Sequence, residues 1–378
     1  MKIAIEAQRI FRPNKHGMDF VALEAIRQLQ KIDRENEYFI FVAPGPDRCL
    51  EESDNLRIVE VKCPTYPLWE QVALPAALRK VKPDLLHCTS NTAPIRCSVP
   101  LILTLHDIIF LEKRQDTNKS TYQNLGRVYR RFVVPRILPK CEKIITVSQF
   151  ECDRIQKALG LPAGRIVAVH NGFGHHFHPV ENYRDTVRKY LPDERYLFFL
   201  GNTDPKKNTP GTLKAYALYA SQTTAPAPLL VADLRDEVVD GILREQGIEF
   251  IRPLLRLAGY IPNTDLPAIY TGAEAFLYTS FRESFGIPLL ESMACGTPVI
   301  TSDASAIPEI AGPGAILVDP YDPAQIAGKI RELECDPQYR RDQVAYGLER
   351  VKAFSWEQTA RGLLKIYKEW EVSAGAAK

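Results

Sequence analysis

The sequence predicts two α/β domains, each built on a parallel β-sheet flanked by helices. Short apolar segments with strand character alternate with helix-like segments along the whole chain. The chain has 378 residues, which exceeds the ~250–300 residues at which a single core stops growing. Between the two halves, Asn171–Pro179 (NGFGHHFHP) lacks periodicity and contains glycine and proline. We therefore expect domains of residues 1–172 and 173–354.

In the first domain, the expected strands are short, apolar and bounded by polar or turn-forming residues. They are Ile3–Ala7, Tyr38–Val42, Leu56–Val61, Leu85–Cys88, Leu101–Leu105, Lys143–Val147 and Ile166–Val169. Asp19–Lys31 is expected to be a helix, because Phe20, Leu23, Ile26 and Leu29 recur with a helical period.

The second domain repeats this alternation. Its expected strands are Leu197–Leu200, Leu229–Ala232, Phe250–Leu255, Ala275–Tyr278, Val299–Thr301 and Ala315–Val318. Residues 355–372 are expected to form a last helix that packs on a domain surface. Ser355 is its expected N-cap, because Gln358 follows at the capping-box spacing. Because strand carboxyl ends carry the ligand loops in open α/β domains, we expect those loops to face a shared cleft.

The composition is that of an ordinary globular protein, with 45% hydrophobic and 25% charged residues. A net charge of +2 gives no case for nucleic-acid binding. The eight cysteines form no Cys-x-x-Cys pair, and the chain opens as a strand rather than as a signal peptide. No apolar stretch approaches the ~18 residues of a membrane span. These features predict a reducing, cytoplasmic setting.

The segment FRESFGIPLLESMACGT (residues 281–297) predicts a loop that leads into a helix. Phe285 and Gly286 form the loop, and Pro288 occupies the expected first helical position, where a missing N–H costs nothing. The start of this helix, around Ile287, offers free N–H groups and the positive end of the helix dipole. This arrangement suits a phosphate group.

Two acids flank this anion site, Glu283 before it and Glu291 in the expected first turn. Carboxylates repel a phosphate, so these two suit hydroxyl groups on either side of it, such as those of ribose and of a second sugar. Alternatively, Glu291 only complements the helix dipole and Glu283 is a solvated loop residue. The paired spacing, the Phe-Gly loop and the strand that follows favour a nucleotide-sugar site.

Three further loops follow apolar strands, at the ends that carry ligands in such folds. Gly17, between the first strand and its helix, permits close backbone approach to a ligand or is simply part of a turn. His106, in Thr104–Asp107, points to the expected site or satisfies nearby backbone. Lys206 and Lys207 neutralise a diphosphate with point charges, or are solvated surface residues.

Two classes of site are disfavoured. No Gly-x-Gly-x-x-Gly fingerprint is present, which argues against a nicotinamide dinucleotide enzyme. No Asp-x-Asp is present to hold Mg²⁺ or Mn²⁺ against a diphosphate, so we expect no metal and no cofactor beyond the donor substrate. His170, His175, His176 and His178 could suggest metal binding, but their irregular spacing fits a linker better.

These segments together resemble glycosyltransferase family 4, retaining enzymes of the GT-B fold with two Rossmann-like domains. WEQ at Trp69–Gln71 is similar to the branch that contains bacterial mannosyltransferases of surface-polysaccharide assembly. The resemblance covers nearly the whole chain and rests on the Glu283–Glu291 segment, THD at Thr104–Asp107, VSQFECDRI at Val147–Ile155, VHNGF at Val169–Phe173, GNTDPKKN at Gly201–Asn208, GYI at Gly259–Ile261 and the terminal FSW.

The resemblance implies transfer of a hexosyl unit, mannosyl favoured, from a GDP- or UDP-sugar to a glycan or lipid-linked glycan, with retained configuration. It implies that the last helix crosses back onto the first domain. Its site roles are donor-sugar contact by Glu283 and His106, ribose binding by Glu291, diphosphate binding by Lys206 and Lys207, base recognition by backbone at Ile261, and acceptor and phosphate contact near Gly17.

The sequence departs from the family pattern at Asn202 and Lys206, where arginine is frequent, and an ammonium lacks arginine's bidentate fork. The rival interpretations are a nucleotide-sugar epimerase of related architecture and a catalytically silent partner subunit. Residues 113–143 combine Arg114, Arg127, Arg130, Arg131, Arg136 and Lys140 with Tyr129, Phe132, Val133 and Val134. This basic, partly apolar segment predicts peripheral contact with an anionic membrane, or is a solvated helix face over core residues.

Overall fold

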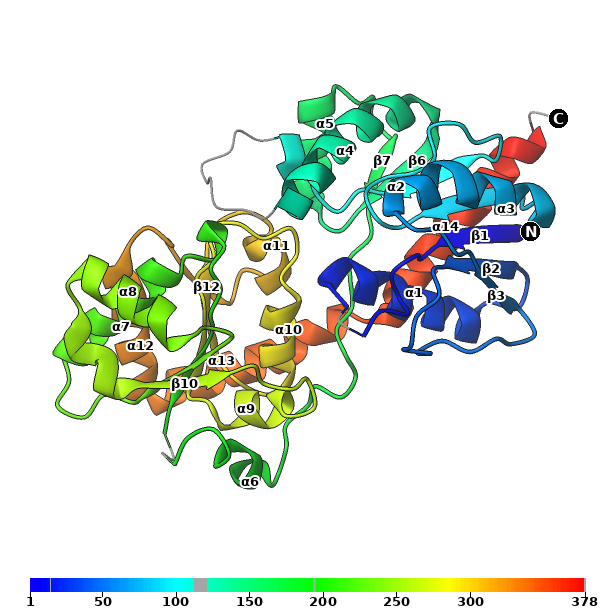
Figure 1. Ribbon diagram of the computed structural model, residues 1–378. Helices are drawn as coiled ribbons and strands as arrows, with labels where there is room; N and C mark the ends of the chain where they lie inside the picture. Colours follow the sequence, from blue (N-terminus) through cyan, green and yellow to red (C-terminus); the bar gives the residue numbers. More distant parts are fainter. Residues whose placement is uncertain (14, 112–120, 193–194, 377–378) are drawn as a thin grey trace. The chain divides into compact units, whose positions relative to one another are not determined.

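The computed structural model describes residues 1–13, 15–111, 121–192 and 195–376. It contains two compact units (Figure 1). The first unit combines Met1–Gly172 with Ser355–Lys378, and the second is Phe173–Phe354. Each is an α/β unit on a parallel sheet, so the predicted fold class is confirmed.

In the described part of the first unit, seven parallel strands follow the order β3-β2-β1-β4-β5-β6-β7. The strands β1 to β3 follow one another toward one edge of the sheet, and the strands β4 to β7 follow one another toward the other edge. The strand order therefore reverses between β1 and β4. The strands are β1 (Lys2–Glu6), β2 (Glu37–Val42), β3 (Leu56–Glu60), β4 (Leu85–Cys88), β5 (Leu101–Thr104), β6 (Cys141–Thr146) and β7 (Ile166–Ala168).

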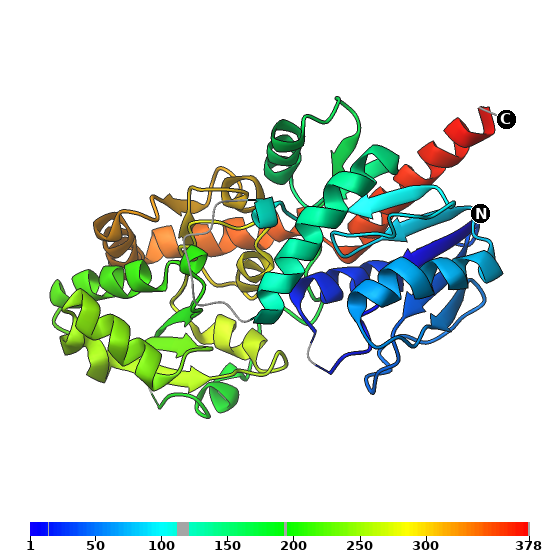
Figure 2. The ribbon, with the colours of Figure 1, turned by 45° about the horizontal axis from the view of Figure 1, so that its top comes forward.

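Helices cover both faces of this sheet, as Figures 1 and 2 show. One face packs on α1 (Gly17–Ile32) and α14 (Trp356–Ala376). The opposite face packs on α3 (Leu74–Val81), α4 (Thr121–Ile137) and α5 (Gln149–Leu159). The short α2 (Tyr66–Leu68) precedes α3 and is joined to it by a π-helix, η1 (Trp69–Ala73).

In the described part of the second unit, six parallel strands follow the order β10-β9-β8-β11-β12-β13. The strands are β8 (Leu197–Leu200), β9 (Leu229–Ala232), β10 (Leu255–Gly259), β11 (Ala275–Tyr278), β12 (Val299–Ser302) and β13 (Ile316–Val318). The helices are α6 (Tyr183–Val187), α7 (Thr209–Ser221), α8 (Asp236–Gln246), α9 (Leu266–Gly272), α10 (Ile287–Ala294), α11 (Ile307–Ala311), α12 (Pro323–Cys335) and α13 (Pro337–Arg350).

The second sheet is also covered on both faces. Side chains of α7, α8 and α12 share one core cluster with the strands. Figure 1 shows these helices on one side of the sheet and α9 and α10 on the other. On that other side, the Tyr270 ring of α9 packs edge-on against Phe198 and Phe276, with centroid distances of 5.3 and 5.2 Å. Because all these strands are parallel, their carboxyl ends lie at one edge of the sheet, and the loops that follow them gather there.

Two expectations are wrong. Phe250–Leu255 is not a strand: Glu249–Leu254 is a 3-10 helix, and strand β10 begins only at Leu255. Pro253 lies inside this segment, and the Phe250 side chain is 58% exposed rather than buried in a sheet. In α1, the Phe20 side chain is 46% exposed, whereas Leu23, Ile26 and Leu29 face the core as expected.

The C-terminal helix packs on the first unit. Ser355 Oγ accepts the Gln358 N–H at 3.1 Å, which confirms the predicted N-cap. Leu363, Ile366 and Tyr367 are buried against α1 and the sheet. The chain leaves the first unit at Gly172 and re-enters it beside that residue. A Cβ at Gly172 would lie 2.2 Å from the Trp356 nitrogen, so only glycine fits there.

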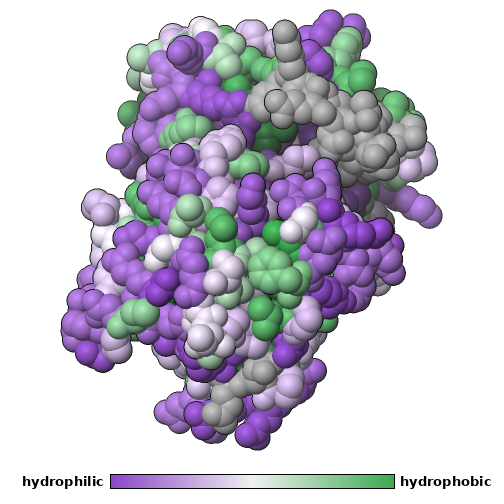
Figure 3. Space-filling model, turned by 90° about the vertical axis from the view of Figure 1, so that its left-hand side faces the viewer, coloured by the Kyte–Doolittle hydropathy of each residue, from purple (hydrophilic) through white to green (hydrophobic). Residues whose placement is uncertain are grey.

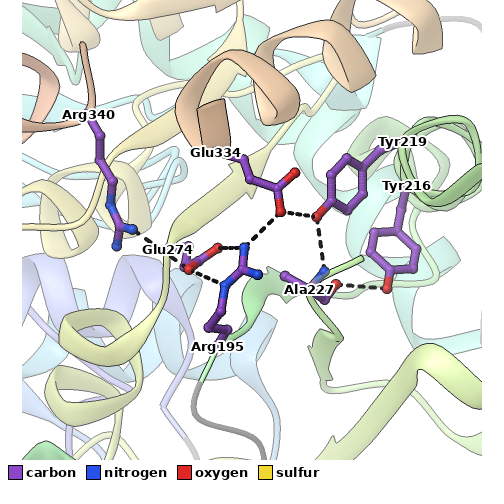
Figure 4. Close-up of polar contacts among 7 residues, drawn as sticks. All are labelled: Arg195, Tyr216, Tyr219, Ala227, Glu274, Glu334 and Arg340. Atoms are coloured by element: carbon purple, nitrogen blue, oxygen red, sulfur yellow. Dashed lines mark hydrogen bonds and ion pairs between the residues drawn. The ribbon is translucent and has the colours of Figure 1, made fainter. Parts of the chain in front are cut away.

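The amino ends of β8 and β11 carry a charged cluster, which Figure 4 shows. Arg195 pairs with Glu274 at 2.8 Å and with Glu334 at 2.7 Å, and these contacts raise its pKa. Tyr219 donates to Glu334 at 3.1 Å and accepts the Ala227 N–H at 2.9 Å. Because every group in this cluster has a partner, we interpret it as scaffold.

The described residues on the face of the molecule in Figure 3 form no large hydrophobic patch. Figure 3 shows a face on which hydrophilic residues predominate and hydrophobic residues form only small separate patches. Within the described residues, no helix has both the length and the hydropathy that crossing a membrane requires.

Candidate active site

The loop after β8 is a compact turn at the carboxyl edge of the second sheet. Pro205–Lys207 form a single 3-10 turn, and the Asp204 carboxylate accepts the Lys206 N–H at 3.2 Å. Asn208 then adopts a left-handed conformation, with φ 55°, before α7 begins. This turn places Lys206 and Lys207, both partly exposed, directly after the strand.

Two contacts dock this loop on the segment that follows β11, and a third reaches Pro320, which follows β13. The Asn208 side-chain amide donates to the carbonyl oxygens of Thr279 at 3.0 Å and Pro320 at 2.8 Å. The Phe281 N–H donates to the Lys206 carbonyl at 2.8 Å. Because Asn208 is buried and its amide is paired, the two loops are held in one arrangement.

An ion pair completes this junction. Lys207 Nζ lies 2.6 Å from Glu283 Oε1, and the Glu283 residue is only 9% exposed. The Glu283 N–H donates to Ser305 Oγ at 2.9 Å, and Lys207 Nζ lies 5.8 Å from the Tyr278 ring centroid. Burial and the charge of Glu283 raise the pKa of Tyr278, so its hydroxyl stays protonated. The structure thus brings together two residues predicted for the site from segments 76 positions apart.

Helix α10 begins at Ile287, not at Pro288, which takes the second position. Gly286 is the N-cap and has φ 107°, a conformation that side chains rarely adopt. A Cβ there would lie 3.0 Å from Ile307 Cδ1. Phe285 is buried and meets the Phe354 ring edge-on at 5.9 Å. Gly286 therefore allows the turn that exposes the helix start to a ligand.

Glu291 lies in the second turn of α10, not in the first as expected, because the helix starts one residue earlier. A role in complementing the helix dipole is thereby weakened, since that effect falls off within the first turn. Burial raises the pKa of Glu291 to about 8. Among the described residues, its carboxyl group has no hydrogen bond or ion pair. A desolvated carboxyl without a partner is an acceptor available to a ligand.

The remaining predicted residue of this unit, Ile261, follows β10. It is 4% exposed and comes two residues after Gly259, which ends the strand with φ 62°. The linker histidines contact neighbours in the same unit: Asn263 Nδ2 lies 3.1 Å from His176 Nε2. Among the described residues, no three His, Cys, Asp or Glu side chains are grouped so as to hold a metal ion.

In the first unit, His106 follows β5 and is buried. Its Nε2–H donates to the Thr89 carbonyl at 2.9 Å, which leaves Nδ1 as the nitrogen with the lone pair. The His106 N–H donates to Asn91 Oδ1 at 2.6 Å. Burial lowers the pKa of His106, so the imidazole is neutral.

Gly17 is the first residue of α1, and His16 is its N-cap in a capping box with Asp19. The His16 N–H donates to Asp19 Oδ2 at 3.0 Å. Among the described residues, nothing lies within 4 Å of the position of a Cβ at Gly17. The space beside this helix start is open, as approach of a ligand to the backbone requires.

The sequence did not predict a buried polar network in the first unit, although Glu70 and Gln71 of the WEQ motif belong to it. Glu70, on the π-helix, accepts from Tyr66 at 2.7 Å, Thr92 at 2.5 Å and Gln71 at 2.8 Å, and also from Tyr129. Four donors satisfy this fully buried carboxylate, so it acts as a structural anchor. No pattern in the sequence signals a contact between segments this far apart.

The chain is similar to known proteins over most of its length. The family model described as Glycosyltransferase Family 4 matches residues 16–175, and that described as Glycosyl transferases group 1 matches residues 184–350. The O-antigen chain mannosyltransferase B of Escherichia coli is 31% identical over 77% of this chain and 76% of its own length.

Two solved structures have the same fold. Sucrose-phosphate synthase from Thermosynechococcus elongatus aligns with a TM-score of 0.74 and 20% identity over 98% of this chain and 99% of its own. The Anabaena protein HepE, in complex with UDP-glucose, aligns with a TM-score of 0.72 and 16% identity over 98% of this chain and 100% of its own.

The fold is that of the GT-B glycosyltransferases, as the two parallel-sheet units and these neighbours show. The chain belongs to glycosyltransferase family 4 and is a hexosyltransferase.

Proposed function

We propose that this enzyme transfers a hexosyl unit, mannosyl favoured, from a GDP- or UDP-sugar to a glycan or a lipid-linked glycan. The observation that carries the proposal is the start of α10 at Ile287, where the unpaired Glu291 carboxyl and the Lys207–Glu283 ion pair flank the end of the helix. The E. coli relative is named a mannosyltransferase, and HepE binds UDP-glucose. Both names support a sugar-nucleotide donor here.

Each group of this site has a place on such a donor. The diphosphate accepts from the N–H at Ile287 and contacts the ammonium groups of Lys206 and Lys207. Glu291 accepts the ribose hydroxyls, and backbone at Ile261 contacts the base. Glu283 accepts from hydroxyls of the transferred sugar. In the first unit, the neutral imidazole of His106 is available to a sugar hydroxyl. Phe285 and Gly286 shape the loop that admits the phosphates.

The chemistry that we propose retains the anomeric configuration. The bond between the anomeric carbon and the diphosphate oxygen breaks, and the acceptor hydroxyl attacks the same face. Its proton passes to the departing phosphate. Lys206, Lys207 and the helix N–H groups stabilise the charge that develops on the leaving group, so the step needs no metal ion.

This mechanism predicts that no covalent glycosyl-enzyme forms, because no carboxylate is proposed to act as a nucleophile. Intact mass spectrometry of the protein incubated with GDP-mannose or UDP-glucose, without acceptor, is expected to show only the unmodified mass. An adduct of one hexosyl unit would contradict same-face attack.

The two rival interpretations predict different products and need different residues. An epimerase of related fold would convert the sugar nucleotide without an acceptor, whereas a transferase leaves free nucleotide diphosphate and a glycosylated product. A silent subunit would have no need to keep Glu283, Glu291 and His106 in its sequence. The desolvated, unpaired carboxyl of Glu291 favours a working site.

A thermal-shift panel of GDP, UDP, ADP and their sugar conjugates tests the donor site. A ligand at 100 times its Kd adds about 2.7 kcal/mol to the free energy of unfolding, or a rise in Tm of roughly 5–10 °C. We expect one nucleotide to produce this shift with or without EDTA, and Glu291→Ala to abolish it. Glu349→Ala, an exposed acid on α13, is the matched control. No shift with any nucleotide would favour the silent subunit.

The affinity for the nucleotide should rise with pH. Free Glu291 has a pKa of about 8, and ribose hydroxyls donate to the carboxylate, so binding releases a proton. Between pH 7 and pH 8.5 the Kd is expected to fall roughly five- to tenfold, and Glu291→Gln should remove this dependence. The stability of the free protein depends on pH in the opposite sense. Because the pKa of Glu291 is raised, its contribution to the free energy of unfolding is fully present below about pH 4.5 and is lost as the pH rises through about 8. A Kd that does not change with pH in calorimetric titrations would contradict the ribose role.

For the acceptor side, we propose contact with an anionic membrane through α4. Leu125, Val128 and Phe132 are 64%, 65% and 52% exposed, and their spacing places them on one side of the helix. Arg131 and Arg136 are also exposed, with the Arg136 guanidinium 3.8 Å from the Phe132 ring centroid. Exposed apolar residues beside arginines suit the boundary between headgroups and acyl chains.

Not all of the residues that the sequence predicted for this surface are exposed. Val133 and Val134 are fully buried, because the helical period turns them toward the core. Tyr129 is partly buried and donates to Glu70. Arg114 and the rest of residues 112–120 lie outside the described residues.

Liposome flotation tests the membrane contact. We expect the protein to float with vesicles that contain phosphatidylglycerol but not with phosphatidylcholine alone. Replacing Leu125, Val128 and Phe132 by serine should reduce the bound fraction about tenfold or more, since each side chain contributes about 1.5–3 kcal/mol when buried. Phe250→Ser, at a 58% exposed position in the second unit, should have no effect. Absence of wild-type flotation with anionic vesicles would refute the proposal.

A further inference from the structure

Ser305, in the loop between β12 and α11, has a backbone conformation that serine rarely adopts. Its φ of 60° lies in the left-handed region, which favours glycine. Among the described residues, it is one of five residues other than glycine with a positive φ. Three of the others are asparagine or aspartate, which enter this region more readily, and Lys82 is the C-cap of α3. Neither explanation applies to Ser305, so the loop keeps a strained residue where glycine would fit without strain.

The hydroxyl group of Ser305 makes a contact that glycine could not make. Ser305 Oγ accepts the N–H of Glu283 at 2.9 Å. Glu283 is largely buried, and a buried backbone N–H without a partner is costly. The next residue of the loop makes the return contact, because the Ala306 N–H donates to the Glu283 carbonyl at 3.3 Å. Both backbone polar groups of Glu283 are therefore bonded to the loop after β12.

A second loop holds Glu283 from the opposite side. In the sheet order β8-β11-β12, the strand before Glu283 lies between the strands that precede Lys207 and Ser305. Lys207 Nζ pairs with Glu283 Oε1 at 2.6 Å, so one neighbour fixes the carboxylate and the other fixes the backbone. Support of this kind is what keeps a ligand-binding side chain in one geometry.

The loop that carries Ser305 is itself anchored at both ends. The Asp303 N–H donates to the Val318 carbonyl of β13 at 2.9 Å. At the other end, the Ile307 N–H donates to the Ala304 carbonyl at 3.3 Å, and the Ile307 side chain is fully buried. The hydrogen bond from Glu283 therefore ends on a fixed support rather than on a loose loop.

We propose that Ser305 is a positioning residue for the transferred sugar. Its hydroxyl fixes the backbone of Glu283, so that the carboxylate meets the sugar hydroxyls in one orientation. Because Glu283 is assigned to the sugar only in the proposed function, this role of Ser305 rests on that proposal. Ser305 lies outside the segments from which the sequence predicts the site.

This role concerns one part of the donor only. In the proposed function Glu283 contacts the transferred sugar, whereas Glu291 contacts the ribose and backbone at Ile261 contacts the base. Loss of the Ser305 hydroxyl should therefore weaken the binding of a sugar nucleotide. It should leave the binding of the free nucleoside diphosphate unchanged.

Calorimetric titrations of Ser305→Ala test this difference with GDP and GDP-mannose and with UDP and UDP-glucose. For the base that binds, we expect the Kd of the sugar nucleotide to rise about three- to tenfold, and the Kd of the free nucleotide not to change. Ser221→Ala is the matched control, because this exposed serine at the end of α7 donates only to the Leu218 carbonyl, at 2.8 Å. Equal weakening of both ligands, or of neither, would overturn the positioning role.

A double-mutant cycle shows whether Ser305 acts through Glu283. In a Glu283→Ala background the carboxylate is absent, so Ser305→Ala is expected to cause no further rise in the Kd of the sugar nucleotide. A further rise as large as that in the wild-type background would mean that Ser305 acts independently of Glu283, which contradicts the proposal.

Ser305→Gly separates positioning from folding stability. Glycine adopts this φ without strain, so the Tm of S305G should exceed that of S305A by roughly 2–4 °C. Both variants lack the hydroxyl, so both should bind the sugar nucleotide equally weakly. If the affinity recovers in S305G together with the Tm, the effect of Ser305→Ala is one of stability and the positioning role is wrong.

Failure of this role is distinct from failure of the proposed function. If Glu283→Ala weakens binding of the sugar nucleotide but Ser305→Ala does not, Glu283 keeps its role and Ser305 loses its own. If Glu283→Ala changes the Kd of neither ligand, the proposed role of Glu283 fails, and the role of Ser305 fails with it.

Discussion

The Lys207–Glu283 ion pair is the interaction on which the candidate site depends. It joins the loop after β8 to the loop before α10, and the Asn208 amide fixes the same two loops through backbone carbonyls. Removing either charge would leave the other, which is largely buried, without a partner. In buried ion pairs this loss typically costs about 3–5 kcal/mol of stability. The pair therefore holds the lysine loop and the start of α10 in register before any ligand arrives.

The two edges of the second sheet differ in how completely their polar groups are satisfied. At the amino edge, Arg195, Glu274 and Glu334 pair with one another and with Tyr219. At the carboxyl edge of the described residues, the Glu291 carboxyl group lacks a partner. Such an unpaired group reduces the stability of the free protein, and a ligand that pairs it recovers that free energy on binding. This contrast identifies one edge as scaffold and the other as the place where we propose that a ligand binds.

Much of the fold could be predicted from local signals. Strands such as Leu85–Cys88, Leu197–Leu200 and Ala275–Tyr278 have the predicted bounds, because a buried parallel strand is a short apolar run. The Phe250–Leu255 prediction failed, because a run with enough apolar residues for a strand contains Pro253 and folds as a 3-10 helix. The N-cap at Ser355 was predictable since capping depends on residues three positions apart.

The site was only partly predictable. The lysine loop and the Glu283–Glu291 segment could be named, because motif spacing and strand ends indicate where ligands bind. Their direct contact, and the Glu70 network, join distant segments and leave no local pattern. Ser305 could not be found, because a serine in a loop is an ordinary feature of sequence. Only its backbone conformation and its contact with Glu283 distinguish it.

The central claim is that the carboxyl edge of the second sheet binds the donor nucleotide. Hydrogen–deuterium exchange with and without saturating GDP or UDP tests it most directly, because protection is located along the chain. The account predicts slower exchange in residues 201–208, 259–261 and 281–291, and no change around Arg195 and Glu334 at the opposite edge. Protection confined to other segments, with these three unchanged by a nucleotide that binds, would contradict it.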